Sequence, residues 1–232
     1  MKKRLAFFPI VLSFYSNQLL AQNFRILSLN FKPMFGNSVL QLNDSVYKLN
    51  KIDSIQFETL KFYVSAIEFW NNSAPVWIEP NSFHLMDASD SNTLKLAFKV
   101  PSDMIYAEIK FKLGIDSLTN VSGAIGGDLD PIKGMYWTWQ SGYVNFKLEG
   151  KSNLCRSRKH EFQFHLGGYT HPYNSLQTIS LLTSNLQDVS IKFDLKTFLS
   201  DVDLENKPSV MSPNKDALIL SNQLGKLFKI KE

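Results

Sequence analysis

Apolar and polar residues alternate with a period of two in five separate stretches of the chain. This period puts every second side chain on the same side of an extended strand, so each stretch predicts a strand with one face in a core and one in water. No long window shows the 3.6-residue period of an amphipathic helix. The alternating stretches are residues 27–31, 94–100, 105–113, 144–148 and 189–195.

The segment from Leu60 to Trp70 is more apolar and richer in aromatic residues, which predicts a strand at the centre of a sheet. Breaks rich in Asp, Asn, Ser and Gly separate the strands, and short helical turns are expected near residues 196–202 and 216–223. No linker or internal repeat divides the chain. The pattern predicts an all-β protein, an antiparallel β-sandwich with long loops in a single domain.

The first residues predict where the protein goes. Met1–Arg4 is a short basic stretch, an apolar stretch follows, and Ala21 offers a small residue for cleavage. This arrangement is typical of a secretory signal peptide and is too short to span a membrane as a helix. We expect residues 1–21 to be a signal peptide and residues 22–232 to be the mature domain. The protein would then be periplasmic or secreted, with no membrane-spanning segment after signal removal.

Removal of the signal peptide changes the charge of the protein. The chain has 25 Lys and Arg against 21 Asp and Glu, a net charge of +4. The signal peptide carries three basic residues and no acids, which leaves 4 − 3 = +1. A nearly neutral domain gives no reason to expect nucleic-acid binding, although the pI of the whole sequence is 9.0.

The single cysteine, Cys155, cannot form an internal disulfide. It lies in a polar stretch and is expected to be an exposed, incidental thiol, with a reactive or metal-binding role as the alternative.

The sequence gives little support to catalysis. It contains no G-x-S-x-G, no H-E-x-x-H, no P-loop and no Rossmann fingerprint, and it has no C-x-x-C-H for a c-type haem. A hydrolase would need carboxylates such as Asp116 and Asp128 to converge in one cleft. We therefore expect the protein not to be an enzyme.

The most unusual segment runs from residue 113 to residue 150. A loop rich in Gly, Asp, Ser and Asn precedes a strand that contains Trp137 and Trp139, two of the four tryptophans. Long loops in compact domains are usually functional or disordered. Both tryptophans are odd-numbered, whereas the apolar residues from Val144 onward are even-numbered. Either a bulge at Ser141–Gly142 turns both halves towards one core, or the Trp pair faces outward and lines a site.

Six pieces of the sequence together carry a resemblance to a known family, and they span nearly all of the mature chain. They are LKFYVSAIEF at 60–69, FHLMDAS at 83–89, GID at 114–116, GDLDP at 127–131, GMYWTWQSGYVNFKLEG at 134–150 and FHLGG at 164–168. In combination they resemble the MbnP-like (methanobactin-associated periplasmic protein) domain family. The resemblance implies an all-β fold, a periplasmic or surface location and, in some relatives, a copper site of histidines completed by an oxidised Trp. It also implies a partner, a di-haem, peroxidase-like cytochrome c that performs the oxidation.

The histidines decide whether such a copper site is expected here. Imidazole is a common copper ligand, but the loop at 118–121 has no histidine where relatives often carry one. His165 lies on the polar face of an alternating strand. We expect it to be a metal ligand with Trp137 and Trp139 nearby, one of them the oxidisable residue.

A second histidine, His84, is two residues from Met86, a spacing that projects both side chains to one side of a strand and would suit Cu(I). A chance pairing in a strand rich in Met and Phe is the alternative. His160 is expected to face solvent, and His171 to cap a turn.

Calcium is the alternative cofactor. Four side chains with oxygen donors crowd the same long loop, and calcium accepts such donors from irregular backbone. Their spacing matches no EF-hand, and turn-forming hydrogen bonds to the backbone would explain them equally. The four are Asp116, Asn120, Asp128 and Asp130.

The leading hypothesis is a secreted, non-enzymatic binding protein of the MbnP-like class that handles copper. The alternative is a structural or interaction module without metal, which binds the cytochrome or a cell-surface glycan through exposed aromatic residues. The candidate metal-site residues are His165, Trp137, Trp139 and His84.

Overall fold

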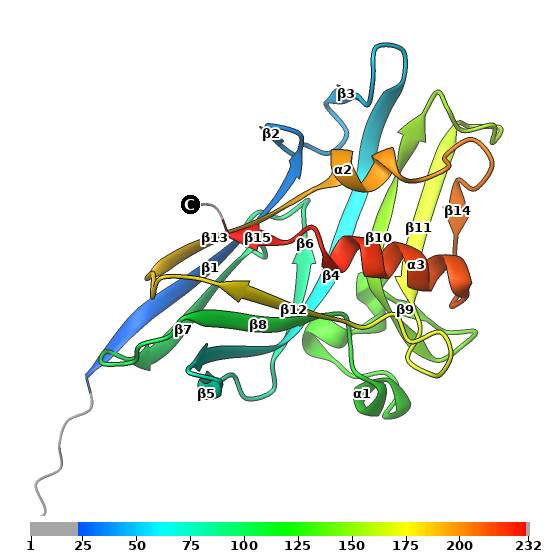
Figure 1. Ribbon diagram of the computed structural model, residues 1–232. Coiled ribbons are helices and arrows are strands. Elements are labelled where there is room, and N and C mark those ends of the chain that lie inside the picture. The colour runs from blue at the N-terminus through cyan, green and yellow to red at the C-terminus, as the bar shows by residue number, and fades with distance from the viewer. Residues whose placement is uncertain (1–22, 231–232) are drawn as a thin grey trace, which may run out of the picture.

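The computed structural model describes residues 23–230, so the predicted signal peptide at 1–21 lies outside the described residues. Strands dominate the fold and form two sheets that pack face to face (Figure 1). The prediction of an all-β sandwich in one domain is confirmed. No helix among residues 23–230 is long and apolar enough to cross a membrane.

The first sheet is the smaller one and has β1 near its centre. β1 pairs with β13 on one side and with β7 and β2 on the other, and β13 also pairs with β15. The strands are β1 (Phe24–Phe35), β2 (Ser38–Val39), β7 (Lys95–Pro101), β13 (Asp188–Asp194) and β15 (Lys229–Ile230).

The second sheet is built around β4, the long strand that the sequence predicted to be central. Its main path runs β12-β8-β4-β10-β11-β14, and shorter strands pair with β4 and β10. The strands are β3 (Val46–Lys48), β4 (Ser54–Asn71), β5 (Ala74–Ile78), β6 (Phe83–Asp87), β8 (Glu108–Leu113), β9 (Tyr136–Trp137), β10 (Gly142–Ser152), β11 (Glu161–Gly167), β12 (Gln177–Leu182) and β14 (Ser209–Val210).

The antiparallel part of the prediction needs a correction, because the sheets are mixed. β1 runs parallel to β13, and β11 runs parallel to β14. A parallel pair needs a long crossover connection, and here each pair is joined through distant parts of the chain. Alternation within one strand says which side is buried but nothing about the direction of its neighbour, so the pattern could not predict these pairs.

The inner faces of the two sheets enclose a core of aromatic and aliphatic side chains. Phe62 lies at its centre, with its ring centroid 6.1 Å from that of Phe31, 5.3 Å from that of Phe193 and 6.0 Å from that of Phe146. Burying one such side chain contributes about 1.5–3 kcal/mol. We call this set the main core, and its members include Leu27, Leu29, Phe31, Phe57, Phe62, Met86, Phe98, Phe111, Phe146, Leu148, Phe162, Phe164, Ile191, Phe193, Leu220, Leu224 and Phe228.

Short helices complete the fold. The two predicted helical turns are present as α2 (Leu195–Ser200) and α3 (Lys215–Gly225), each capped by a side chain that accepts a backbone N–H. α3 directs Leu220 and Leu224 into the main core. The remaining helices lie between β8 and β9, and are α1 (Ser117–Val121), η1 (Gly127–Leu129) and η2 (Pro131–Lys133).

One prediction about strand faces was wrong in detail, and an alternative left open about another strand can be decided. The strand expected over 105–113 begins at Glu108, and Ile105 is exposed whereas Tyr106 is buried. The sequence also left open whether a bulge at Ser141–Gly142 changes the parity before Val144 or the Trp pair faces outward. The register of β10 against β11 instead shifts between Val144 and Phe146, so the extra residue of the bulge is Asn145.

Candidate functional site

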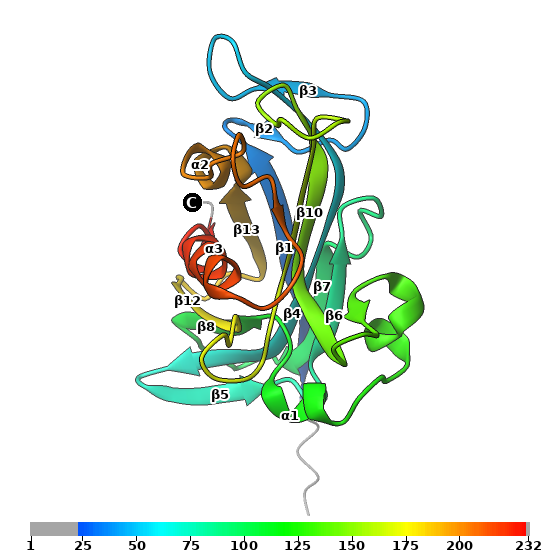
Figure 2. The ribbon, with the colours of Figure 1, turned by 90° about the vertical axis from the view of Figure 1, so that its right-hand side faces the viewer.

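The long loop predicted from the sequence folds over the outer face of the second sheet. We call residues 114–141 the covering segment. Figure 2 shows α1 in green at the lower end of the strands and the rest of the segment in green on one side of β4 and β10, while β13 and α3 lie on the other side. Its apolar residues and the outward residues of the sheet form a second, smaller set, which we call the outer cluster. The outer cluster consists of Tyr63, Leu85, Ile115, Leu129, Met135, Trp137, Tyr143 and Val144.

The two tryptophans of the covering segment have different environments. Trp137 is 7% exposed, and its ring packs against Gly167, where an added Cβ would lie 2.7 Å from ring atom Cζ3. Trp139 is 65% exposed, with its ring centroid 5.9 Å from that of Trp137. The sequence left open whether the pair packs in a core or faces outward. In the structure the two residues differ: Trp137 packs in the outer cluster, and Trp139 lies on the surface.

His165 lies on the same side of the second sheet as Trp137. It is two residues from Gly167 in β11, and its neighbours Phe164 and Leu166 point into the main core. His165 is nevertheless buried, at 9% exposure, rather than standing free on a polar face.

A carboxylate fixes the ring of His165. Its Nε2 lies 2.7 Å from Oε1 of Glu149, which faces the same side on β10, and Lys147 Nζ lies 3.6 Å from the same oxygen. The hydrogen bond from His165 lowers the pKa of Glu149 to about 2; partial burial opposes this, and Thr59 and Lys147 assist it. This pair was missed in the sequence, because only the pairing of Lys147 with His165 across the strands brings the two residues together.

His84 belongs to the other side of the second sheet. Its neighbours Phe83 and Leu85 contact the outer cluster, so His84 and Met86 point towards the first sheet. Met86 is fully buried in the main core, and His84 Nε2 lies 2.8 Å from Oε2 of Glu79. The sheet therefore separates His84 from His165.

The four oxygen-bearing side chains of the loop serve the backbone. Asp116 caps α1 by accepting the N–H of Thr119, and Asp130 caps η2. Asn120 is buried and accepts the N–H of Tyr143 at 2.8 Å while donating to two carbonyls of the loop. Asp128 accepts the backbone N–H of Leu85 at 3.2 Å and also accepts from Lys133 Nζ at 2.6 Å. These bonds match the turn-forming interpretation, and each side chain has its own partners.

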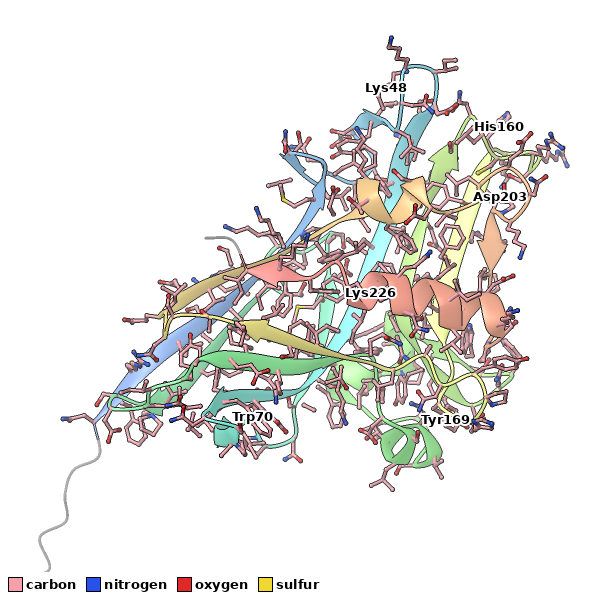
Figure 3. The ribbon with its side chains drawn as sticks, viewed as in Figure 1. Lys48, Trp70, His160, Tyr169, Asp203 and Lys226 are labelled. Carbon is pink, nitrogen blue, oxygen red and sulfur yellow. The ribbon has the colours of Figure 1, made fainter. Side chains whose placement is uncertain are left out.

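Further bonds hold the covering segment rigidly on the sheet. Tyr63 Oη donates to the carbonyl of Asp128 at 3.0 Å, and burial raises the pKa of Tyr63. Tyr143 Oη accepts the N–H of Ile125 at 3.0 Å. Ser117 Oγ donates to the carbonyl of Tyr169, which lies beside α1 in Figure 3.

The donors present on the outer face of the second sheet do not by themselves fit a copper centre. His165 lies on this face and His84 on the opposite one, and all four histidines lie in the described range. Within residues 23–230, no three His, Cys, Asp or Glu side chains are arranged to hold a metal ion.

Cys155 is buried in the main core, where burial raises its pKa to about 11, so the expectation of an exposed thiol was wrong. His160 Nδ1 lies 2.8 Å from the carbonyl of Cys155.

Exposed apolar side chains are concentrated on the covering segment. Sequence reasoning singled out the tryptophans and missed the exposed aliphatic residues of the same segment. The signal was present, because apolar residues stand in a loop whose other residues are mostly small and polar. The exposed apolar residues of the segment are Leu118, Val121, Ile125, Ile132 and Trp139.

Comparison with known proteins adds a family and a fold. The family model MbnP matches residues 25–212 of the chain. Among solved structures, MbnP from Methylosinus trichosporium aligns with a TM-score of 0.64 at 14% sequence identity, over 85% of this chain and 88% of that chain. At that level of identity the likeness shows a shared fold. A search of curated proteins finds no match.

Proposed function

The chain belongs to the MbnP family, and on that premise we propose that it is a secreted, non-enzymatic binding protein whose covering segment docks a partner protein. The observation that carries the proposal is the group of exposed apolar side chains on this segment. Ile132 is 88% exposed and Leu118 is 80% exposed. Single apolar residues on a surface are normal, whereas a group of them on one segment is typical of interaction sites.

The rigidity of the covering segment supports the same proposal. Its carbonyls and amides are bonded to Tyr63 and Tyr143 of the sheet beneath, and Asp128 also accepts the N–H of Leu85 at 3.2 Å. A surface that is already ordered loses little conformational freedom when a partner binds, which favours affinity. The segment therefore presents its apolar side chains in a fixed arrangement.

The chemistry of the exposed side chains on the covering segment favours a protein over a glycan as the partner. Four of the five exposed apolar residues are aliphatic, and only Trp139 offers a ring on which a sugar could stack. Exposed aliphatic side chains are suited to a complementary apolar surface. The partner we propose is the di-haem, peroxidase-like cytochrome c that the family resemblance implies.

The test is a binding titration of the purified protein with that cytochrome. Trp139→Ala and Ile132→Ser are each expected to weaken binding by about tenfold or more, because truncating a residue at the centre of an interface hot spot commonly costs about 2 kcal/mol or more. Leu182→Ser is the matched control, since Leu182 is as exposed as Leu118 but lies on β12. Equal affinity of all variants would refute the docking surface. Loss with Trp139→Ala alone, together with binding to a sugar, would favour a glycan instead.

Copper binding is the second candidate function, and the pairing of His165 with Glu149 beside Trp137 favours it. Metal-binding histidines are commonly oriented by a carboxylate in this way. The unmodified side chains supply one imidazole, so a copper site would need a further donor, which an oxidised Trp137 or Trp139 would provide. Copper content and intact mass of protein from its native compartment test this. Copper that is lost in His165→Ala, with a mass shift on a tryptophan, would support the candidate; a metal-free, unmodified protein would exclude it.

A further inference from the structure

Three lysines lie side by side on the outer face of the first sheet. Lys32 of β1 pairs with Lys192 of β13, and Lys192 pairs with Lys229 of β15 (Figure 1). Neighbouring strands are about 4.8 Å apart, so the three residues span about 10 Å. We call them the lysine row. Like charges directly opposite each other on neighbouring strands repel, so stability alone disfavours this arrangement.

The lysine row has no carboxylate partner among residues 23–230, although salt bridges are common elsewhere in that range. None of its three ammonium groups forms an ion pair or donates a side-chain hydrogen bond there. The row therefore presents three positive charges that no carboxylate within residues 23–230 pairs with. The lysines that do pair with a carboxylate are Lys61, Lys110, Lys133, Lys147, Lys151, Lys159 and Lys207.

The lysine row lines a surface cavity of about 550 Å³. That volume is within the range of small-molecule sites, which are commonly 300–1,000 Å³. Asn37 and Thr197 add polar groups to the wall, and Met34 and Leu227 add apolar surface. The three charges are thus gathered in a concave site rather than spread over a flat face.

The carboxylate of Asp194 lines the same cavity, and its two oxygens already accept hydrogen bonds from neighbouring residues. Its Oδ1 accepts the backbone N–H groups of Gly36 at 2.8 Å and Lys196 at 2.9 Å, and its Oδ2 accepts from Thr197 Oγ1 at 3.0 Å. Asp194 therefore serves as the cap of α2. Its charge still counts, and three lysines against one carboxylate leave 3 − 1 = +2 on the cavity wall.

We propose that this cavity binds a phosphate-bearing ligand with at least two negative charges. Lysine presents a compact charge with three donors and is a common phosphate binder. A row of three ammonium groups can contact several oxygens of such a ligand at once. The ligand could be a soluble phosphate compound or a lipid headgroup, since both carry the same group. The cavity and the covering segment lie on opposite outer faces of the sandwich, so this proposal does not depend on the proposed function.

Calorimetric titration of the purified protein with sodium pyrophosphate tests the site. We expect one-site binding that weakens as NaCl is added, because salt screens exposed charges. Lys192→Gln removes the centre of the lysine row and is expected to weaken binding by about tenfold or more, since a hydrogen bond to a charged group is commonly worth that much. Lys99→Gln is the matched control. Lys99 lies on the same face opposite Ile26, six residues along β1 from Lys32, or about 20 Å away.

Two further variants separate loss of the site from loss of the fold. Lys192→Arg keeps the charge and should keep most of the affinity. Lys192→Gln should unfold at the same temperature as the wild type or higher, because it removes repulsion within the row. Absence of pyrophosphate binding by the wild-type protein, or equal loss in Lys192→Gln and Lys99→Gln, would overturn the proposal.

Vesicles identify the source of the phosphate group. Sedimentation with vesicles that contain phosphatidic acid, whose phosphomonoester headgroup can carry two negative charges, but not with phosphatidylcholine vesicles, competed by pyrophosphate, would assign the site to a lipid headgroup. Pyrophosphate binding without vesicle binding would assign it to a soluble phosphate compound. Vesicle binding that survives in Lys192→Gln would count against the lysine row as the binding site.

Discussion

The protein is expected to lose stability in acid, and replacing Glu149 with Gln is expected to remove part of that loss. The hydrogen bond from His165 holds the pKa of Glu149 at about 2 in the folded protein, against 4.5 for a free glutamate. Since the folded-state value is the lower one, the carboxylate stabilises the fold above about pH 4.5, and this stabilisation is lost as the pH falls towards 2.

The size of the effect follows from that difference in pKa. At about 1.36 kcal/mol per unit it corresponds to about 3 kcal/mol. The Glu149 side chain is 22% exposed, and solvent screening reduces the contribution to about 1–2 kcal/mol. More than half of it should be lost by about pH 3, so the free energy of unfolding should fall by about 1 kcal/mol more in the wild type than in Glu149→Gln.

Urea unfolding followed by tryptophan fluorescence at about pH 6 and about pH 3 measures this difference. Glu205→Gln is the control, because Glu205 pairs with Arg156 on the exposed surface and such pairs contribute little. Its stability should depend on pH as that of the wild type does. If Glu149→Gln lost as much stability between the two pH values as the wild type, the His165–Glu149 pair would not be the source of the effect.

Two further substitutions test how the covering segment is attached. Gly167→Ala would put a Cβ 2.7 Å from the Trp137 ring. This should lower the free energy of unfolding in urea by about 1–3 kcal/mol and shift the tryptophan fluorescence. Gly126→Ala is the control and should be nearly neutral, because no atom lies within 4 Å of the added Cβ. Asn120→Ala leaves the buried N–H of Tyr143 without its acceptor, which should cost about 1–3 kcal/mol and speed hydrogen exchange at that amide. Unchanged exchange, or equal stability of the two alanine variants of glycine, would contradict these expectations.

The sequence predicted the strands well because their inner faces follow a local rule. Leu27, Leu29 and Phe31 of β1 all enter the main core, as their alternation predicted. The rule fails where a strand is buried on both sides. Tyr63 of β4 is as buried as Phe62, because the covering segment packs on the face that would otherwise meet water. Nothing in the local pattern says that a loop 50 residues later will cover that face.

The candidate site depended even more on contacts between distant parts of the chain. The sequence put His165 on the outward face of its strand, and the structure agrees on that face. It could not show that Glu149 faces the ring, because a shift of one residue in the register of β10 against β11 would turn Glu149 to the other side. The bulge at Asn145 shifts the register of β10 against β11 by one residue, and no residue near it in the sequence predicts the bulge. The metal ligands proposed from the sequence stay a prediction.

The separation of the main core from the outer cluster has a consequence for how this protein can diverge. The two sets share only the strands between them, and Asn145 sits where β10 passes from one to the other, accepting the N–H of Ile115 and donating to Ser175. Mutations at the exposed positions of residues 114–141 therefore leave the packing of the sandwich untouched. Evolution, or selection from a randomised library, can therefore change what this surface binds while the sandwich stays the same. Antibody domains vary their binding loops on a constant framework in the same way.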